Sequence, residues 1–320
     1  MAQGILAGVR AMGMPEHVVS VLASDAGLLA VSPSQGSHGL QDVPHLVLPL
    51  LVEALRSGVR YASAPTAPGS LLVIAGDLDQ ARAEASQLAA ELGQRPDEVL
   101  VATRDAARAG DVYAWLVVTS EEAVAQRRRR WRHAPGVVII AIDAPMSDTD
   151  RDWAERVIAA SEPTAVWGVA DATRKPSDVL AWSEDLGGLD ALVITAGASS
   201  RSPFSALSTG IPLARYERTL ARPEELASAA ITRLSGFLAA RAGANRLEAT
   251  GGAGMPATLA EHLAGTACIA CSACSLPRSA RRAFPETAGM PETAGMPGTA
   301  QRTGLAGMPG TDRTAGWEAL

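Results

Sequence analysis

The pattern of hydrophobic and polar residues changes near residue 67 of this chain. Before that point, apolar residues recur at helical spacing, which predicts helices over residues 4–14, 15–27 and 43–58. A stretch rich in alanine, proline and serine follows, over residues 62–70, and its composition is typical of a linker. The sequence therefore predicts an N-terminal helical region that ends at about residue 66.

Beyond the linker, short apolar runs alternate with amphipathic helical segments. The runs that predict strands cover residues 70–76, 97–103, 111–119, 136–143, 164–170, 190–195 and 211–216. The segments that predict helices cover residues 77–93, 120–132, 148–161, 176–186 and 223–240. Strands that are apolar throughout are buried on both faces, and helices between them imply parallel crossovers. We therefore expect an α/β domain over residues 67–241, with a doubly wound, mostly parallel sheet of six or seven strands.

The remaining residues, 242–320, have a different composition. An AGMP unit recurs among glycine, proline and threonine, and such a sequence buries too little apolar surface to offset its ordering entropy, so we predict a largely disordered tail. The chain's three cysteines, Cys268, Cys271 and Cys274, lie in this tail with the spacing that opens an iron–sulfur motif, but no fourth cysteine follows. We favour a chance run or a loose metal trap, and keep a metal or iron–sulfur protein as an alternative.

Charge and hydropathy argue against two classes of protein, nucleic-acid binders and proteins that span a membrane. The net charge of the 320 residues is −6, which argues against a general nucleic-acid binder, and no apolar run is long enough to span a membrane. A cytoplasmic location is therefore expected. The one dense basic stretch, residues 126–133, is most simply a solvated helix face; its functional interpretation is a surface for an anionic partner, either an acidic protein or the face of a membrane.

The loops after the strands are where a ligand would bind, because ligands of open α/β sheets bind beyond the carboxyl ends of the strands. The order of these loops, with "VVIIAIDAPMSDTDRDWAERV" and "ALVITAGASS" in their places, resembles that of the signal-recognition-particle GTPase family, and most of all its flagellar-placement branch. The resemblance covers about residues 68–234. It implies a P-loop NTPase fold with an N-terminal helical bundle, and GTP with magnesium as the ligand of a working member.

The phosphate-binding loop of that family is not matched here. The family has a glycine-rich loop that ends in Gly-Lys-Thr, whereas this chain has Gly76 followed by Asp77 and Asp79, without a lysine. Two carboxylates would face the triphosphate and repel it. Our structural interpretation is that Asp77 and Asp79 cap the helix that follows.

The other nucleotide motifs have mostly lost their chemistry too. Asp143 survives from Asp-Thr-Ala-Gly without the glycine, and more often such a residue caps a turn than binds magnesium. Thr195 survives from the guanine-reading Thr-Lys-x-Asp without its aspartate. Arg104, or Arg108, corresponds to the arginine of Asp-Thr-x-Arg. Asp171 and Lys175, the chain's one lysine, lie where the family has a dimer-contacting segment, although Lys175 reads more simply as a solvated surface residue.

Two functional hypotheses follow for the α/β domain. The first is a catalytically inactive, GTPase-like binding or regulatory module that needs no cofactor and binds a protein partner, either a related GTPase or a component of secretion or motility. The second is a GTPase with divergent motifs, which would hold GTP and magnesium with Arg82 or Arg104 in place of lysine. Neither needs an integral membrane segment or nucleic acid, and both leave peripheral contact with a membrane open.

Overall fold

The computed structural model describes residues 2–29, 43–147 and 151–249. The chain divides into two units, Met1–Cys271 and Ser272–Leu320, and every described residue belongs to the first. The tail predicted over residues 242–320 begins too early, because residues 242–249 belong to the last described helix, Pro223–Ala249. The rest of the predicted tail, with its three cysteines, lies outside the described residues.

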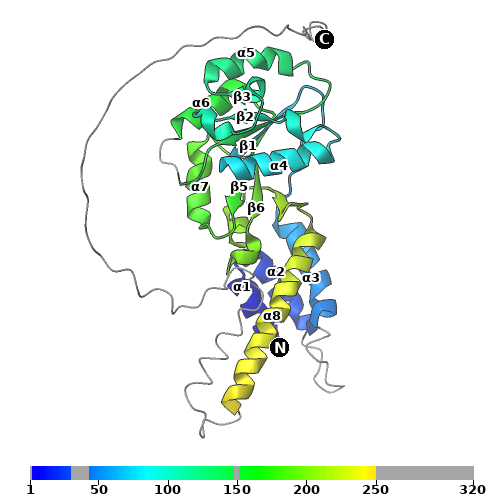
Figure 1. The fold of residues 1–320 in the computed structure, drawn as a ribbon. Helices are drawn as coiled ribbons and strands as arrows, with labels where there is room; N and C mark the ends of the chain where they lie inside the picture. Colours follow the sequence, from blue (N-terminus) through cyan, green and yellow to red (C-terminus); the bar gives the residue numbers. More distant parts are fainter. Residues whose placement is uncertain (1, 30–42, 148–150, 250–320) are drawn as a thin grey trace, which may run out of the picture. The chain divides into compact units, whose positions relative to one another are not determined.

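Eight strands form a single sheet in the order β3-β2-β4-β1-β5-β6-β7-β8, and Figure 1 shows it flanked by helices. The strands are β1 (Leu71–Gly76), β2 (Leu100–Ala102), β3 (Val117–Val118), β4 (Val138–Asp143), β5 (Ala165–Asp171), β6 (Ala191–Thr195), β7 (Leu213–Tyr216) and β8 (Thr219–Leu220). All neighbours pair in parallel except β7 and β8. The predicted doubly wound, mostly parallel α/β fold is therefore confirmed.

Helices cover both faces of the sheet. Alternate residues of β1 reach opposite faces: Leu72 and Ile74 pack with α4 (Leu78–Glu91), and Val73 and Ala75 belong to the core that holds α5, α6 and α7. Those three helices span Glu121–Trp131, Asp152–Ser161 and Pro176–Asp185. Since all six residues of β1 are buried, the central strand has the unbroken apolar sequence expected of a strand enclosed on both sides.

The N-terminal helices α1 (Ala2–Ala11), α2 (Glu16–Leu29) and α3 (Val43–Gly58) pack with α8 (Pro223–Ala249), as Figure 1 shows. Their buried residues belong to one core with residues of β6 and β7. The amide of Phe204 donates to the carbonyl of Met12 across this junction, at 3.1 Å. Gly13 is needed there, because its φ is +78° and an added Cβ would lie 2.9 Å from the amide nitrogen of Ser205.

The predicted strand over residues 111–119 is mostly wrong. Ala114–Leu116 forms a 3₁₀ turn, the amide of Leu116 donates to the carbonyl of Tyr113, and only two residues join the sheet as β3. The aromatic and aliphatic residues that suggest a strand here differ in burial: Tyr113 and Trp115 are exposed, whereas Leu116 is buried. The prediction also missed β8, the short antiparallel strand that brings the sheet to eight strands.

Within the part of the chain that the structure describes, no helix combines the length and apolar character that crossing a lipid bilayer requires.

Candidate functional site

The turn between β1 and α4 occupies the position of the phosphate-binding loop. β1 ends at Gly76 and α4 begins at Leu78, so one residue, Asp77, connects them. The Asp77 carboxylate accepts a hydrogen bond from the amide of Asp79 at 3.2 Å, and its carbonyl accepts the first helical bond from Ala81 at 2.8 Å. Asp77 is therefore the N-cap of α4, as predicted, and Asp79 stands in the first turn, where the helix dipole favours a negative charge.

Packing within the sheet favours a residue without a Cβ at Gly76. A Cβ built on it would lie 3.1 Å from the Cβ of Val169 and 3.2 Å from the Val169 carbonyl oxygen, on the neighbouring strand β5. These separations are tighter than normal van der Waals contact. The glycine that the resemblance assigns to phosphate binding thus has a structural reason of its own.

Asp143 ends β4 next to Gly76, with which it is in register. Its side chain is only 7% exposed, and its Oδ2 accepts from the Thr103 hydroxyl at 3.1 Å and from Arg108 Nη1 at 2.5 Å. Asp143 therefore ties the loop after β2 to the edge of the sheet. Of the two arginines considered from sequence, Arg108 makes this ion pair.

Burial raises the pKa of Asp143, and the charge of Asp77 acts in the same direction, against the opposing effects of Arg108 and Thr103. Its Oδ1 is buried and makes no hydrogen bond. A carboxyl group in this environment holds its negative charge less readily than a free aspartate.

Asp143 and Arg108 line a cleft of about 210 Å³, together with Arg104, Arg151 and Trp153. Arg151 is already engaged: it forms an ion pair with Asp185 and donates to the carbonyl of Met146 at 2.6 Å. Positive charge at this cleft is therefore partly neutralised by the protein itself.

Two of the three remaining candidates are neighbours, because Asp171 and Thr195 are in register at the carboxyl ends of β5 and β6. Asp171 accepts from the amide of Thr173 at 2.7 Å and so closes a local turn. Lys175 is exposed and directly precedes α7. Thr195 lies at the end of β6 and lines a separate hollow of about 340 Å³ with Glu84 and Arg218. Among the sequence-predicted positions, the structure brings together Gly76, Asp77 and Asp143, with Arg104 beside them. It also pairs Asp171 with Thr195 and places Lys175 apart from both groups.

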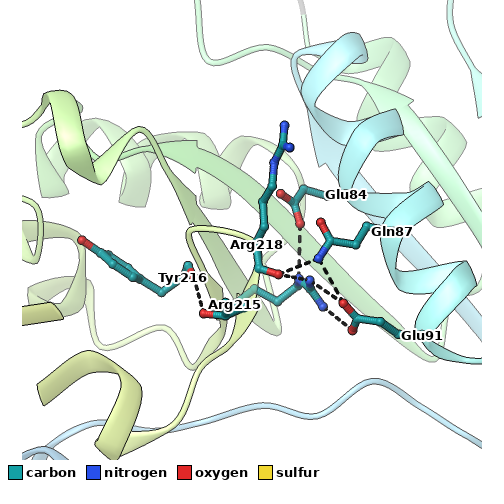
Figure 2. Close-up of polar contacts among 7 residues, drawn as sticks. Glu84, Gln87, Glu91, Arg215, Tyr216 and Arg218 are labelled. Atoms are coloured by element: carbon teal, nitrogen blue, oxygen red, sulfur yellow. Dashed lines mark hydrogen bonds and ion pairs between the residues drawn. The ribbon is translucent and has the colours of Figure 1, made fainter. Parts of the chain in front are cut away.

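A buried ion-pair network on the other side of α4 was not predicted. Arg215 of β7 is 1% exposed, and its guanidinium donates two hydrogen bonds to the carboxylate of Glu91, at 2.7 and 2.9 Å. Its Nε lies 3.2 Å from Oε2 of Glu84, which is 3% exposed. Figure 2 shows both glutamates reaching from α4 toward the guanidinium, with Tyr216 on the opposite side of the strand.

Backbone and amide groups complete this network. Arg215 also donates to the carbonyl of Arg218, and Gln87 Nε2 donates to that same carbonyl at 2.7 Å and to Glu91 at 3.1 Å. Burial raises the pKa of Glu84, whereas the hydrogen bonds from Arg215 lower the pKa of Glu91. The network joins α4 to the β7–β8 hairpin.

Among the described residues, no three or more histidine, cysteine, aspartate or glutamate side chains are placed to share a metal ion. Cys268, Cys271 and Cys274 lie outside the described part. Two ion pairs at the cleft are made within the protein, Arg108 with Asp143 and Arg151 with Asp185.

Comparison with known proteins gives a likeness of structure alone. No protein-family model and no curated protein matches the sequence. A crystal structure of FlhF with GTP and Mg²⁺ bound matches with a TM-score of 0.50 and 14% identity, over 72% of this chain and 98% of FlhF. The signal recognition particle receptor FtsY from Elizabethkingia anophelis (TM-score 0.46, 10% identity, 67% of this chain and 77% of FtsY) and chloroplast FtsY from Physcomitrella patens (0.44, 16%, 68% and 81%) are further matches. The predicted resemblance is thus confirmed at the level of the fold: the chain folds as signal-recognition-particle-type GTPases do.

Proposed function

We propose that this chain is a GTPase-fold protein that does not hydrolyse GTP and acts in the cytoplasm as a binding or regulatory module. The observation that carries the proposal is the one-residue turn at Asp77. A P-loop places four residues between its two glycines, so that successive amides and a lysine surround the phosphates. A single residue between strand and helix leaves no such loop.

Electrostatics support the same conclusion. The carboxylate of Asp77 already occupies the amide end of α4, which is the position that an anion would take. A phosphate about 4 Å from that carboxylate is repelled by about 1 kcal/mol in water and by more in a site that excludes solvent.

The alternative, a GTPase that uses arginine in place of lysine, has less support. Arg82 donates to the carbonyl of Ala109 at 3.2 Å and so helps to hold the loop after β2. Arg104 lines the cleft beside Asp143, which would oppose a polyanion there.

The proposed ligand is a protein. By analogy with the family that it resembles, the partner would be a related GTPase or a component of protein targeting, secretion, or flagellar or pilus assembly. This choice of partner is drawn from the fold and not from the site.

Phosphate release from GTP by the full-length chain, with magnesium, tests the proposal. We expect no release above that of GTP in buffer alone. Magnesium-dependent turnover that is abolished in both Arg82→Ala and Arg104→Ala would establish the alternative. Retention of a related GTPase by the immobilised full chain in nucleotide-free buffer is the matching test of the partner.

A further inference from the structure

Two aromatic rings stand exposed in the loop that leads to β3. Tyr113 is 63% and Trp115 62% exposed, and the two rings stack with their centroids 6.2 Å apart. The other large apolar side chains exposed among the described residues are three leucines at separate positions, Leu48, Leu180 and Leu220. Adjacent exposed aromatic rings are uncommon on a free surface, because they leave a large apolar area in contact with water. A partner that covered the rings would remove this area from water.

The turn that carries the rings is held in place by the hydrophobic core and by α5. Leu116, in the same 3₁₀ turn, is 2% exposed and anchors the turn in the core. Arg127 of α5 donates from Nη1 to the carbonyl of Trp115 at 2.9 Å. A fixed turn presents the rings without the loss of conformational freedom that ordering a flexible loop would require.

Positive charge lies beside the rings. Arg130 is exposed and lies about one helical turn beyond Arg127, on the same side of α5. Arg128 and Arg132 belong to another side of the helix, where both pair with Glu162. The basic stretch predicted from the sequence therefore has two sides. Glu162 neutralises Arg128 and Arg132 on one side, and the charges of Arg127 and Arg130 on the other side are available to a partner.

A small cavity of about 130 Å³ adjoins Tyr113. Its apolar lining includes Val101 and Val112, and its charged lining residues are Arg82, Asp97 and Asp111. One apolar side chain of a partner would fit there. Asp97 and Asp111 would repel a carboxylate, so that an acidic residue of a partner would lie outside this cavity, toward the arginines.

We propose that Tyr113 and Trp115, together with Arg127 and Arg130, form a docking surface for an acidic segment of a partner protein. An apolar side chain of the segment enters the cavity beside Tyr113, the rings pack on its backbone, and its carboxylates face the two arginines. Tyrosine, tryptophan and arginine are the residues that most often dominate protein interfaces. The inference rests on the proposed role as a binding module, and it is independent of whether GTP binds.

Selection of a random peptide library on the full chain tests this surface, with counter-selection against the double variant Tyr113→Ala/Trp115→Ala. We expect the selected peptides to be enriched in aspartate and glutamate next to an apolar residue. In fluorescence anisotropy their affinity should fall at least about 30-fold in the double variant. Arg130→Glu should lower it about tenfold and weaken its dependence on salt.

Matched controls separate a local effect from a general one. Leu220→Ser removes an exposed apolar side chain elsewhere, and Arg201→Glu reverses an exposed charge elsewhere; both should bind the peptides like the unaltered chain. Because the rings are exposed, the double variant should keep the circular dichroism spectrum and the midpoint of thermal unfolding.

Several results would overturn the inference: a selection that yields no peptides that discriminate between the two proteins, peptides without an excess of acidic residues, or equal affinity for the double variant. Sedimentation with phosphatidylserine vesicles that depends on the rings, without peptide binding, would assign the surface to a membrane instead. Phosphate release from GTP would contradict the proposed inactivity alone and would leave these binding results unaffected.

Discussion

The start and the later turns of helix α4 show opposite kinds of chemistry. At the start, an exposed aspartate in a one-residue turn caps the helix. Further along, Glu84 and Glu91 reach a guanidinium that is 1% exposed and bind it through an ion pair and two hydrogen bonds. The end of α4 at which the resembled family binds nucleotide has a local cap, whereas the side of α4 that faces the sheet has a buried network of charged residues.

This difference shows what positions the helix. In a nucleotide-binding protein of this fold, the bound phosphates contact the first turn of the helix that follows β1. Here protein groups do so: the cap at Asp77, the apolar contacts of Leu78, Ala81 and Leu88 with the sheet, and the buried network with Arg215. Contacts within the protein thus position this helix.

The largest expected effect comes from Arg215→Met. The change leaves Glu84 buried without its counterion and removes both hydrogen bonds to Glu91, which should lower the free energy of unfolding by about 3–5 kcal/mol. Urea denaturation followed by circular dichroism measures it. As the matched control, the triple variant Arg215→Met/Glu84→Gln/Glu91→Gln should recover part of this loss, since no charge remains buried; a loss below about 1 kcal/mol in the single variant would show that the network does not hold α4.

A smaller effect is expected from Glu91→Gln. Glu91 is 39% exposed, so that loss of its charge should lower the free energy of unfolding by about 1–2 kcal/mol at neutral pH. Because Arg215 lowers the pKa of Glu91 in the folded state, its contribution is present above the ordinary glutamate pKa of about 4.3 and is lost as the pH falls through the lower folded value. Denaturation curves of the two proteins should therefore converge in acid; a difference that grows below pH 4 would contradict the assignment.

The cap at Asp77 should contribute about 1 kcal/mol. Asp77→Ala removes the acceptor for the Asp79 amide, and its effect on the midpoint of urea unfolding should disappear in Asp77→Asn, which keeps a capping oxygen. If Asp77→Asn were as unstable as Asp77→Ala, the residue would act by something other than capping.

Lys175→Ala should have the smallest effect. The side chain is exposed at the start of α7, and its loss should change the free energy of unfolding by no more than about 0.5 kcal/mol. Arg174→Ala is a suitable control, because it removes an exposed positive charge from the same loop. A much larger change for Lys175 alone would reveal a contact that the folded chain depends on.

The sequence predicts the chemistry at the start of α4 well and that of its later turns poorly, for a physical reason. A capping residue and its helix are adjacent in the sequence, so the position of Asp77 directly before a helical pattern is enough to predict the cap. Arg215 pairs with residues that are more than a hundred positions away in the sequence. From the sequence alone, an arginine within an apolar strand is most simply interpreted as a residue that points to solvent.

Two signals could have revealed the network. Glu84 stands among Ala81, Ala85 and Leu88, on the apolar side of its helix, and Arg215 stands between Ala214 and Tyr216 in a strand that is otherwise apolar. A charged residue on each of two buried faces suggests a partner of opposite sign. The exposed Tyr113 and Trp115 were missed for a related reason, because aromatic residues favour a strand by composition whether or not a neighbouring strand is present.

Isothermal titration calorimetry of the full chain with GTP and magnesium tests the central claim most directly. A turn of one residue capped by a carboxylate predicts no saturable heat at GTP concentrations up to about 1 mM, a limit that corresponds to a binding free energy weaker than about −4 kcal/mol. Saturable, magnesium-dependent binding at micromolar GTP would contradict it, and would mean that the end of β1 opens to admit the phosphates.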